Sequence, residues 1–235
     1  MKKPFFVLVY LIVYFNGVSQ LISRVDFDLI KNNIQDVHSK FYYPELVKRL
    51  LEKDSALNEV EYTHLYYGSV FQKEYQPYGM SILKKRFIEE YNSKEYKKAV
   101  ETAEHALTET PVDLEILLKL SICYLELGSQ NEKRAYAKIY FSFLDVIYQS
   151  GNGADINSAY VVVSVNDEYS ILEDLSLTAV KQQLIGDCDV LSFRRRDQDR
   201  IKGAKKIKEL YFNVKKPLMS LSNSYKNVDL PEAED

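Results

Sequence analysis

The chain contains no tryptophan, and its 235 residues include only two cysteines and three histidines. The signatures of common enzymes are also missing: there is no HExxH, no GxSxG, no phosphate-binding glycine loop and no CxxC pair. His38, His64 and His105 are widely spaced and have no cysteine at zinc-like intervals, so we expect no metal site. We therefore predict that the protein is not an enzyme and uses no cofactor.

The two cysteines lie far apart in the chain. Cys123 falls on the apolar face of a predicted helix, and Cys188 begins a predicted strand. Spacing alone does not bring them together. Because free cysteine packs as a small hydrophobic residue, we expect two buried thiols rather than a Cys123–Cys188 disulfide. A nucleophile pair of Cys188 and His64 is the catalytic alternative, and it would need activation by neighbouring groups.

The first residues have the pattern of a secretory signal. Lys2 and Lys3 precede an apolar run, Phe5 to Phe15, and small residues then precede a cleavage site after Ser19. A membrane-spanning helix needs about 20 apolar residues, so this run is too short for a permanent anchor. We expect a signal peptide over residues 1–19 and a periplasmic or secreted protein with no membrane span after signal removal. A buried N-terminal helix or strand is the alternative.

Charge excludes another class of partner. The formal net charge is −3, and removal of the signal lysines makes it more negative. Export and mild acidity together argue against nucleic acid. The basic stretch "RRRDQDRIKGAKKIK", residues 194–208, contains two aspartates that dilute its charge, so we expect an exposed loop. Binding of an anionic glycan or a lipid headgroup there is the alternative.

Apolar spacing predicts helices from Asp26 to about Tyr148. Asp26 is placed to cap the first helix, and Pro44 stands at the start of the second. Asn58, in "NEVE", begins a capping box, and we expect Gly68 to end that helix in the left-handed conformation.

The clearest organisation lies between Leu83 and Tyr148. "EYKKAVETAEHALTETP" has small alanines at helical spacing and a terminating proline, as in the second helix of a tetratricopeptide repeat. "LLKLSICYLELG" fits the first helix of the next repeat, with Leu117 in place of tryptophan and Ser121 in place of glycine. Arg86 departs from the pattern at a leucine position. The pattern indicates about one and a half repeats, fewer than the roughly three that a solenoid needs.

The pattern changes at the turn-rich stretch "QSGNGADINS", residues 149–158. Beyond it, short β-branched or aromatic runs predict strands at Ala159–Val165, Cys188–Phe193 and Leu210–Val214, with a helix over residues 167–185. We predict an α+β fold: a helical tetratricopeptide-like region over residues 20–150, and a small antiparallel β-sheet packed on it. The sheet belongs to a β-rich subdomain over residues 151–222, and the acidic tail over residues 223–235 is expected to be disordered.

Two neighbouring carboxylates occur in "NDEY", residues 166–169. The favoured interpretation is that Asp167 caps the helix that follows the strand. The alternatives are calcium ligation together with "GNGADIN", or acid–base chemistry with Glu168.

One stretch, residues 58–79, is rich in tyrosine. Tyr62, Leu65 and Tyr66 form a helical stripe of the kind that is buried. His64 and Tyr67 point away from that stripe, and Pro77 favours an extended loop that carries Tyr75 and Tyr78. The pattern favours structural packing. The alternative is a binding surface for a protein or a glycan, with His64, Tyr67, Tyr75 and Tyr78 as its candidate residues.

Three stretches resemble a family of secreted proteins of unknown function from Gram-negative gut bacteria. They are "FYYPELVKRLLEKDSALNEVEYTHLYYGSVFQKEYQPYG", "GADINSAYVVVSVNDEYSIL" and "ELYFNV". The resemblance implies a helical, tetratricopeptide-like body and export, and it implies no catalytic residues.

These observations lead to three functional hypotheses. The first is a non-catalytic scaffold of the cell envelope that binds a protein or peptide. The second is a glycan-binding accessory protein, although the chain has no tryptophan, the side chain on which bound sugars usually stack. The third is a hydrolase, which would need two facing carboxylates or a Cys/His pair in a concave pocket.

Overall fold

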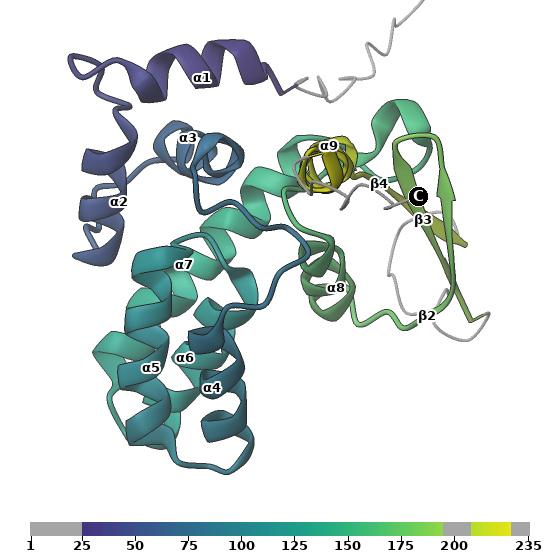
Figure 1. Cartoon of the computed structure of the whole chain (residues 1–235). Helices are drawn as coiled ribbons and strands as arrows, with labels where there is room; N and C mark the ends of the chain where they lie inside the picture. Colours follow the sequence, from purple (N-terminus) through teal and green to yellow (C-terminus); the bar gives the residue numbers. More distant parts are fainter. Residues whose placement is uncertain (1–24, 195–207, 227–235) are drawn as a thin grey trace, which may run out of the picture.

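The structure, a computed structural model, describes residues 25–194 and 208–226. The predicted signal peptide, most of the basic stretch and the tail beyond residue 226 lie outside the described residues. The fold is α+β, with a helical body followed by a sheet near the C-terminus (Figure 1).

The helical body begins with α1–α3 and continues as the bundle α4–α7 (Figure 1). Its helices are α1 (Phe27–Gln35), α2 (Tyr43–Leu51), α3 (Glu59–Gly68), α4 (Ile82–Asn92), α5 (Tyr96–Glu109), α6 (Leu114–Glu126) and α7 (Gln130–Gln149). A short 3₁₀ turn, η1 (Ser69–Phe71), follows α3. Consecutive helices of the bundle pack on one another, and α3 lies between α1 and α2 on one side and α7 on the other.

The predicted helix starts are confirmed. The side chain of Asp26 accepts a hydrogen bond from the backbone of Leu29, and Asn58 forms a capping box with Glu61. Helix α3 ends at Gly68 as predicted, but the predicted left-handed conformation is wrong, because the φ of Gly68 is −69° and the chain continues into η1. Space at Gly68 is tight: a Cβ there would lie 3.2 Å from the side chains of Ile34 and Tyr43.

Small residues allow the close packing of α5. Ala99, Ala103 and Ala106 are fully buried against the neighbouring helices, and α5 ends at Glu109, just before Pro111. The alanine pattern therefore marks a packed helix pair, as predicted.

The sheet has the order β1-β4-β3-β2. Its strands are β1 (Tyr160–Val161), β2 (Ala179–Ile185), β3 (Cys188–Phe193) and β4 (Glu209–Asn213). Strands β2, β3 and β4 pair antiparallel, but β1 pairs parallel with β4, so the described sheet is mixed rather than antiparallel. The short turn η2 (Ile156–Ser158) precedes β1, helix α8 (Val165–Asp174) follows it, and α9 (Lys215–Lys226) follows β4.

Strand β2 corrects the prediction of a helix over residues 167–185. Helix α8 ends at Asp174, and Ser176 has a φ of +54°, which stops helical propagation. Ile185 pairs with Cys188 around a two-residue turn in which Gly186 has a φ of +61°. Glycine at the first position of such a turn is typical of a β-hairpin. The dipeptide "GD" therefore indicates the hairpin, although the apolar spacing of residues 167–185 predicts a helix.

The core is shared between the helices and the sheet. It includes Leu65 and Phe143 from the helical body and Leu191 and Phe212 from the sheet. In β4, Leu210 and Phe212 are buried and Tyr211 between them is half-buried, the alternation of a strand with one face on the core. Helix α9 continues to Lys226, so the first four residues of the predicted tail, 223–226, are helical.

Candidate functional site

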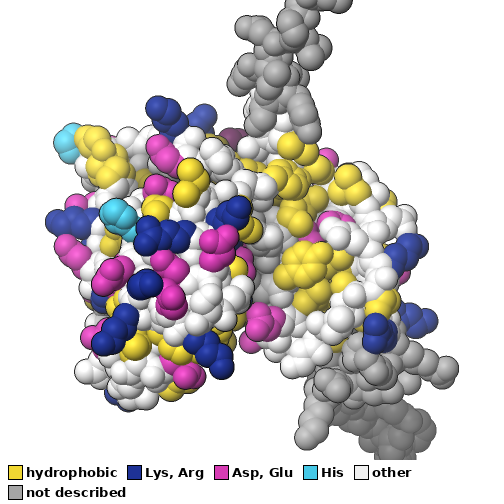
Figure 2. All heavy atoms as spheres, turned by 60° about the horizontal axis from the view of Figure 1, so that its bottom comes forward, with side chains coloured by type: hydrophobic (Ala, Val, Ile, Leu, Met, Phe, Trp, Pro, Cys, Tyr) yellow, Lys and Arg dark blue, Asp and Glu magenta, His cyan; other side chains and the backbone are white. Residues whose placement is uncertain are grey.

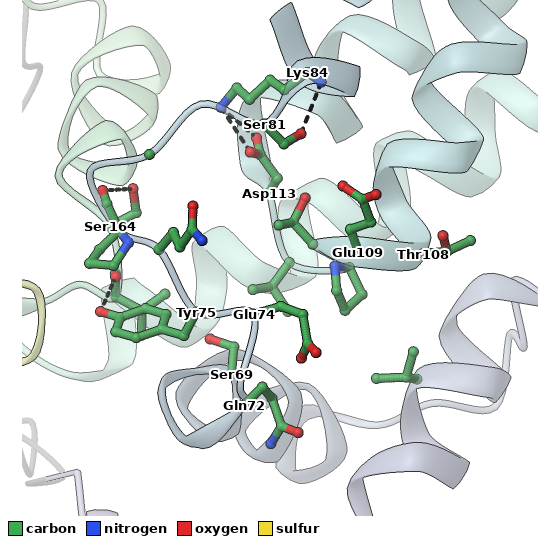
Figure 3. A pocket seen from close by; sticks show the side chains of 18 of the residues that line it. Ser69, Gln72, Glu74, Tyr75, Ser81, Lys84, Thr108, Glu109, Asp113 and Ser164 are labelled. Carbon is green, nitrogen blue, oxygen red and sulfur yellow. Dashed lines mark hydrogen bonds and ion pairs between the residues drawn. The ribbon is translucent and has the colours of Figure 1, made fainter. Parts of the chain in front are cut away.

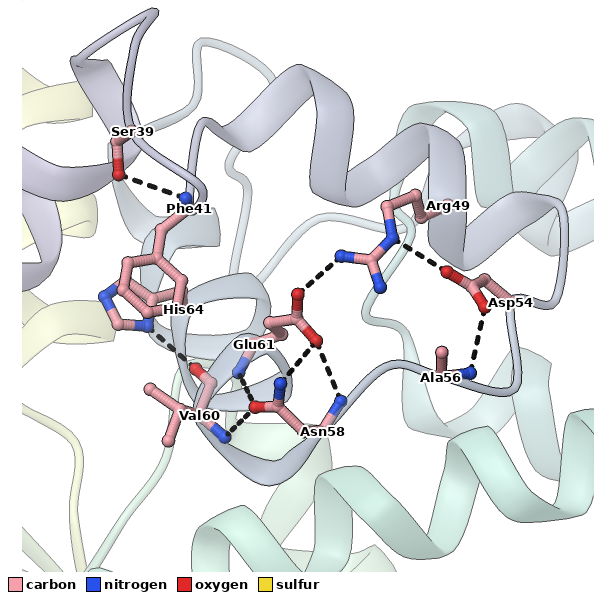
Figure 4. A network of polar contacts seen from close by, with 9 residues as sticks. All are labelled: Ser39, Phe41, Arg49, Asp54, Ala56, Asn58, Val60, Glu61 and His64. Atoms are coloured by element: carbon pink, nitrogen blue, oxygen red, sulfur yellow. Dashed lines mark hydrogen bonds and ion pairs between the residues drawn. The ribbon is translucent and has the colours of Figure 1, made fainter.

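His64 is part of the interior rather than of a binding surface. It is 5% exposed, and its ring stacks on Phe41 with the ring centroids 3.8 Å apart (Figure 4). Its Nδ1 lies 2.8 Å from the carbonyl of Val60, and its Nε2 lies 3.0 Å from the amide nitrogen of Asn33. Burial lowers the pKa of His64, so the ring is neutral: Nδ1 donates to the carbonyl and Nε2 accepts from the amide.

The other polar contacts in this region fix the entry into α3. Glu61 accepts hydrogen bonds from the backbone and side-chain nitrogens of Asn58 and pairs with Arg49, which also binds Asp54 (Figure 4). These contacts join α2 to the start of α3.

Three tyrosine hydroxyls tie α3 and the following loop to the segment around β1. Tyr67 is 1% exposed and donates to the carbonyl of Val161 at 3.2 Å. Tyr75 donates to the carbonyl of Val163 at 2.6 Å. Tyr66, fully buried, donates to Asp167 at 2.6 Å and accepts from the backbone of Val163 at 3.3 Å. Tyr66, Tyr67 and Tyr75 therefore have the structural packing role that the pattern of this stretch favours.

A cleft of about 250 Å³ opens where the parts of the molecule meet (Figure 3). Its walls come from α2, the segment 69–81, the α5–α6 turn and the start of α8. The apolar part of the lining is Tyr43, Pro44, Val47, Pro77, Pro111, Val112 and Val163, and the polar part includes Ser69, Gln72, Gln76, Ser81, Thr108, Thr110, Ser164 and Asn166.

The wall between α3 and α8 is held in place by hydrogen bonds. Ser164 donates its hydroxyl to the carbonyl of Pro77 at 3.3 Å, and Tyr75 is fixed on Val163 as described above. These bonds join segments far apart in the sequence and fix this wall of the cleft.

Among the residues that the structure describes, one lysine lines the cleft, and it is already paired. Lys84, 4% exposed, lies 2.8 Å from Asp113 and 3.1 Å from Glu115. Burial alone would lower the pKa of Lys84, but the charges and hydrogen bonds of the two carboxylates outweigh it and raise the pKa. The lysine therefore stays charged, and its charge is neutralised within the wall.

Two carboxylates of the lining remain available. Glu74 and Glu109 are exposed, and neither forms an ion pair with a described residue. The described lining contains four carboxyl groups, those of Glu74, Glu109, Asp113 and Asp167, and one lysine, Lys84. The cleft is therefore acidic.

Asp167 has a structural role close to the predicted one. Ser164, not Asp167, is the N-cap of α8, and Asp167 completes the capping box by accepting from the backbone of Ser164 at 3.1 Å. Burial raises the pKa of Asp167 to about 7. The prediction that Asp167 helps to cap α8 is correct, but the N-cap position itself is occupied by Ser164.

Glu168 was not expected in the interior. It is fully buried, and neither carboxylate oxygen has a hydrogen-bond partner. Burial first, and then the nearby charges of Asp189 and Asp167, raise the pKa of Glu168 to about 9. The side chain is therefore protonated at neutral pH, and no substrate can reach it.

The two pairs considered for catalysis, Cys188 with His64 and Asp167 with Glu168, form no accessible site among the described residues. The charge of Asp189 contributes to the raised pKa of Glu168, but Asp189 is only 6% exposed and accepts a hydrogen bond from Gln182. Cys188 is a buried free thiol whose pKa is raised by burial, and Cys123 is also buried and free. His64 has Phe41, Asn33 and Val60 as its neighbours rather than Cys188. No group of three or more potential metal ligands occurs in the described ranges.

An apolar ridge borders the cleft. Tyr78 is 47% exposed, Met80 58% and Ile82 87%, whereas Gly79 and Ser81 between them line the cleft. We call Tyr78, Met80 and Ile82 the apolar ridge. On the face shown in Figure 2, charged side chains gather over the helical side of the molecule, and hydrophobic side chains are exposed nearer the sheet. Of the four predicted surface residues, Tyr78 belongs to this ridge, Tyr75 is half-buried, and His64 and Tyr67 are buried.

No described helix is both long enough and apolar enough to cross a bilayer. Comparison with curated proteins and with solved structures found no match. A family model described as "Domain of unknown function (DUF4919)" matches residues 28–223, a range that contains the sheet, the described lining of the cleft and all of the helical body except Phe27, the first residue of α1. The chain therefore belongs to the DUF4919 family.

Proposed function

We propose that this protein is a non-catalytic interaction scaffold that holds a peptide segment of a partner protein in the cleft. The observation that carries the proposal is the cleft itself, a preformed hollow with a mixed polar and apolar lining and an exposed apolar ridge on its border. Concave sites of this composition are typical of ligand recognition. Exposed apolar side chains that gather in one place often mark a contact surface.

The hydrogen bonds that fix the cleft wall support ligand binding. The segment 69–81 is fixed by Tyr75 and by the contact of Ser164 with Pro77, so little additional ordering is needed when a ligand enters. The polar groups of the lining provide hydrogen bonds to a peptide backbone, and the apolar groups contact its side chains.

The proposed location is the cell envelope. The support for export is the signal pattern over residues 1–19, and the support for a scaffold is the packed helix series α4–α7 with its tetratricopeptide-like spacing. Helical repeats of that type present grooves to segments of other proteins.

A glycan ligand is less well supported. A sugar platform needs exposed aromatic rings, and Tyr78 is the one predicted aromatic candidate that is mostly free of packing contacts with the interior. Tyr67 and Tyr75 use their hydroxyls to bind backbone carbonyls.

A selection from a random dodecapeptide library tests the proposal. The bait is residues 20–235, and the affinity of each selected peptide is measured by fluorescence anisotropy. Thr108→Trp places a bulky ring at the edge of the cleft, where Thr108 is exposed. Thr63→Trp is the matched control, since Thr63 also donates its hydroxyl to a carbonyl of the preceding turn but lies outside the cleft.

The expected result is a set of peptides that bind the wild type and the Thr63→Trp variant but bind Thr108→Trp at least about tenfold more weakly, a loss of about 1.4 kcal/mol. A selection that returns no binder, or binders that the two variants retain equally, would overturn the proposal.

A further inference from the structure

We infer that the segment held in the cleft is cationic, with lysine or arginine side chains next to apolar ones. The inference rests on the proposed function, because it names the chemistry of the partner segment. It follows from the charges of the lining and from the apolar ridge beside it.

The available charge in the cleft is negative. Glu74 lies on the segment that follows η1, and Glu109 is the last residue of α5, so they approach the cleft from two different walls (Figure 3). Both are exposed and neither is paired with a described residue. A cationic side chain in the cleft can therefore form ion pairs without breaking an existing contact.

An acidic segment would find no such partner. Lys84 is the single cation among the described residues of the lining, and Asp113 and Glu115 already hold it at 2.8 Å and 3.1 Å. Asp113 also caps α6 by accepting from the backbone of Ile116, so it is fixed in that position. Like charges brought to Glu74 and Glu109 would repel, which makes the cleft selective as well as attractive.

The apolar ridge distinguishes a peptide from a small cation. Met80 and Ile82 are more than half exposed next to the cleft, and a free polyamine or a single amino acid has only a short aliphatic chain with which to cover them. A peptide with apolar residues beside its lysines covers the ridge and reaches the carboxylates together. We therefore commit to a segment of a protein as the occupant.

Three labelled decapeptides test the inference. They share one apolar framework and carry lysine, glutamate or glutamine at the same alternating positions, and each is titrated by fluorescence anisotropy at low and high salt. The variant Glu74→Gln/Glu109→Gln removes the available charges of the cleft. Glu89→Gln/Glu101→Gln is the matched control, since both glutamates are exposed, belong to α4 and α5, and lie outside the cleft.

The lysine peptide should bind most tightly, and its binding should weaken with salt. Two surface charge pairs are worth about a threefold to tenfold change in affinity together, so Glu74→Gln/Glu109→Gln should lose that amount for the lysine peptide and nothing for the glutamine peptide. The control should match the wild type. Met80→Ser/Ile82→Ser should weaken the lysine and glutamine peptides alike, which a small cation site would not do.

The possible failures are distinct. Equal binding of all three peptides would leave the proposed function standing and overturn the inference. A loss that is the same in Glu89→Gln/Glu101→Gln would mean that overall charge, not the cleft, attracts the lysine peptide, and would also overturn it. Binding of none of the three overturns the inference, and an empty library selection as well would overturn the proposed function. Melting curves of every variant establish that each is folded.

Discussion

Replacing Glu168 with glutamine should make the stability of the protein almost independent of pH in mildly alkaline solution. In the wild type this fully buried carboxyl has a pKa of about 9, raised from 4.5, chiefly by burial. The folded state therefore holds a proton between pH 4.5 and about pH 9 that the unfolded state has released. The contribution of Glu168 to the free energy of unfolding is complete below pH 4.5. It decreases as the pH rises above 4.5 and is lost by about pH 9.

The magnitude follows from this linkage. One titrating group changes the free energy of unfolding by about 1.4 kcal/mol per pH unit. At pH 7.5, three pH units above the ordinary value of 4.5, keeping Glu168 protonated costs the folded state about 4 kcal/mol. The glutamine amide replaces a protonated carboxyl that is equally without partners, so their burial costs nearly cancel. Glu168→Gln should therefore be more stable than the wild type at pH 7.5.

Urea denaturation followed by circular dichroism at pH 7.5, 8.0 and 8.5 measures the effect. Asp167, with a pKa of about 7, is largely ionised in this range and adds little to the slope. The wild type should lose about 1.4 kcal/mol of unfolding free energy between pH 7.5 and 8.5, and Glu168→Gln should stay flat. Equal slopes in the two proteins would refute the assignment of a protonated, buried Glu168.

Three further predictions concern the contacts that hold the cleft walls and the packing of the sheet on the helical body. Tyr66→Phe removes the hydroxyl that lies 2.6 Å from Asp167 and should cost about 2 kcal/mol in urea denaturation, whereas an unchanged stability would show that this bond is not needed. Lys84→Met leaves Asp113 and Glu115 without their cation and should also cost about 2 kcal/mol, a loss that high salt should reduce but not abolish. Truncation after Gly151 uncovers helix surface that the sheet buries, so the fragment should aggregate; a soluble fragment that melts cooperatively would mean that the helical body has its own complete core.

Local signals predicted the parts of the fold that depend on local chemistry. Asp26 and Asn58 cap helices through their own side chains, and strand β3 has the predicted bounds Cys188–Phe193. Helix α9 is not predicted, because it follows directly on β4 within the region predicted to be β-rich. Strand β2 was missed because its apolar residues Val180, Leu184 and Ile185 are exposed, so burial does not impose an alternating pattern on it.

The candidate surface failed for a different reason. Helical periodicity distinguishes a buried stripe from an exposed face when one side of the helix is covered. Helix α3 is covered by α1 and α2 and also by α7, so His64 and Tyr67 are buried along with Tyr62 and Tyr66. The cleft itself was beyond sequence reasoning, because its walls come from segments that are far apart in the chain and meet only in the folded protein.

Hydrogen–deuterium exchange of the wild type with and without a saturating amount of the tightest library peptide tests the central claim most directly. If the peptide lies in the cleft, backbone amides of residues 72–81 and 108–113 should exchange more slowly in the complex, and those of α1 and β2 should not change. Protection confined to segments outside the cleft, such as the exposed strand β2, would contradict the claim.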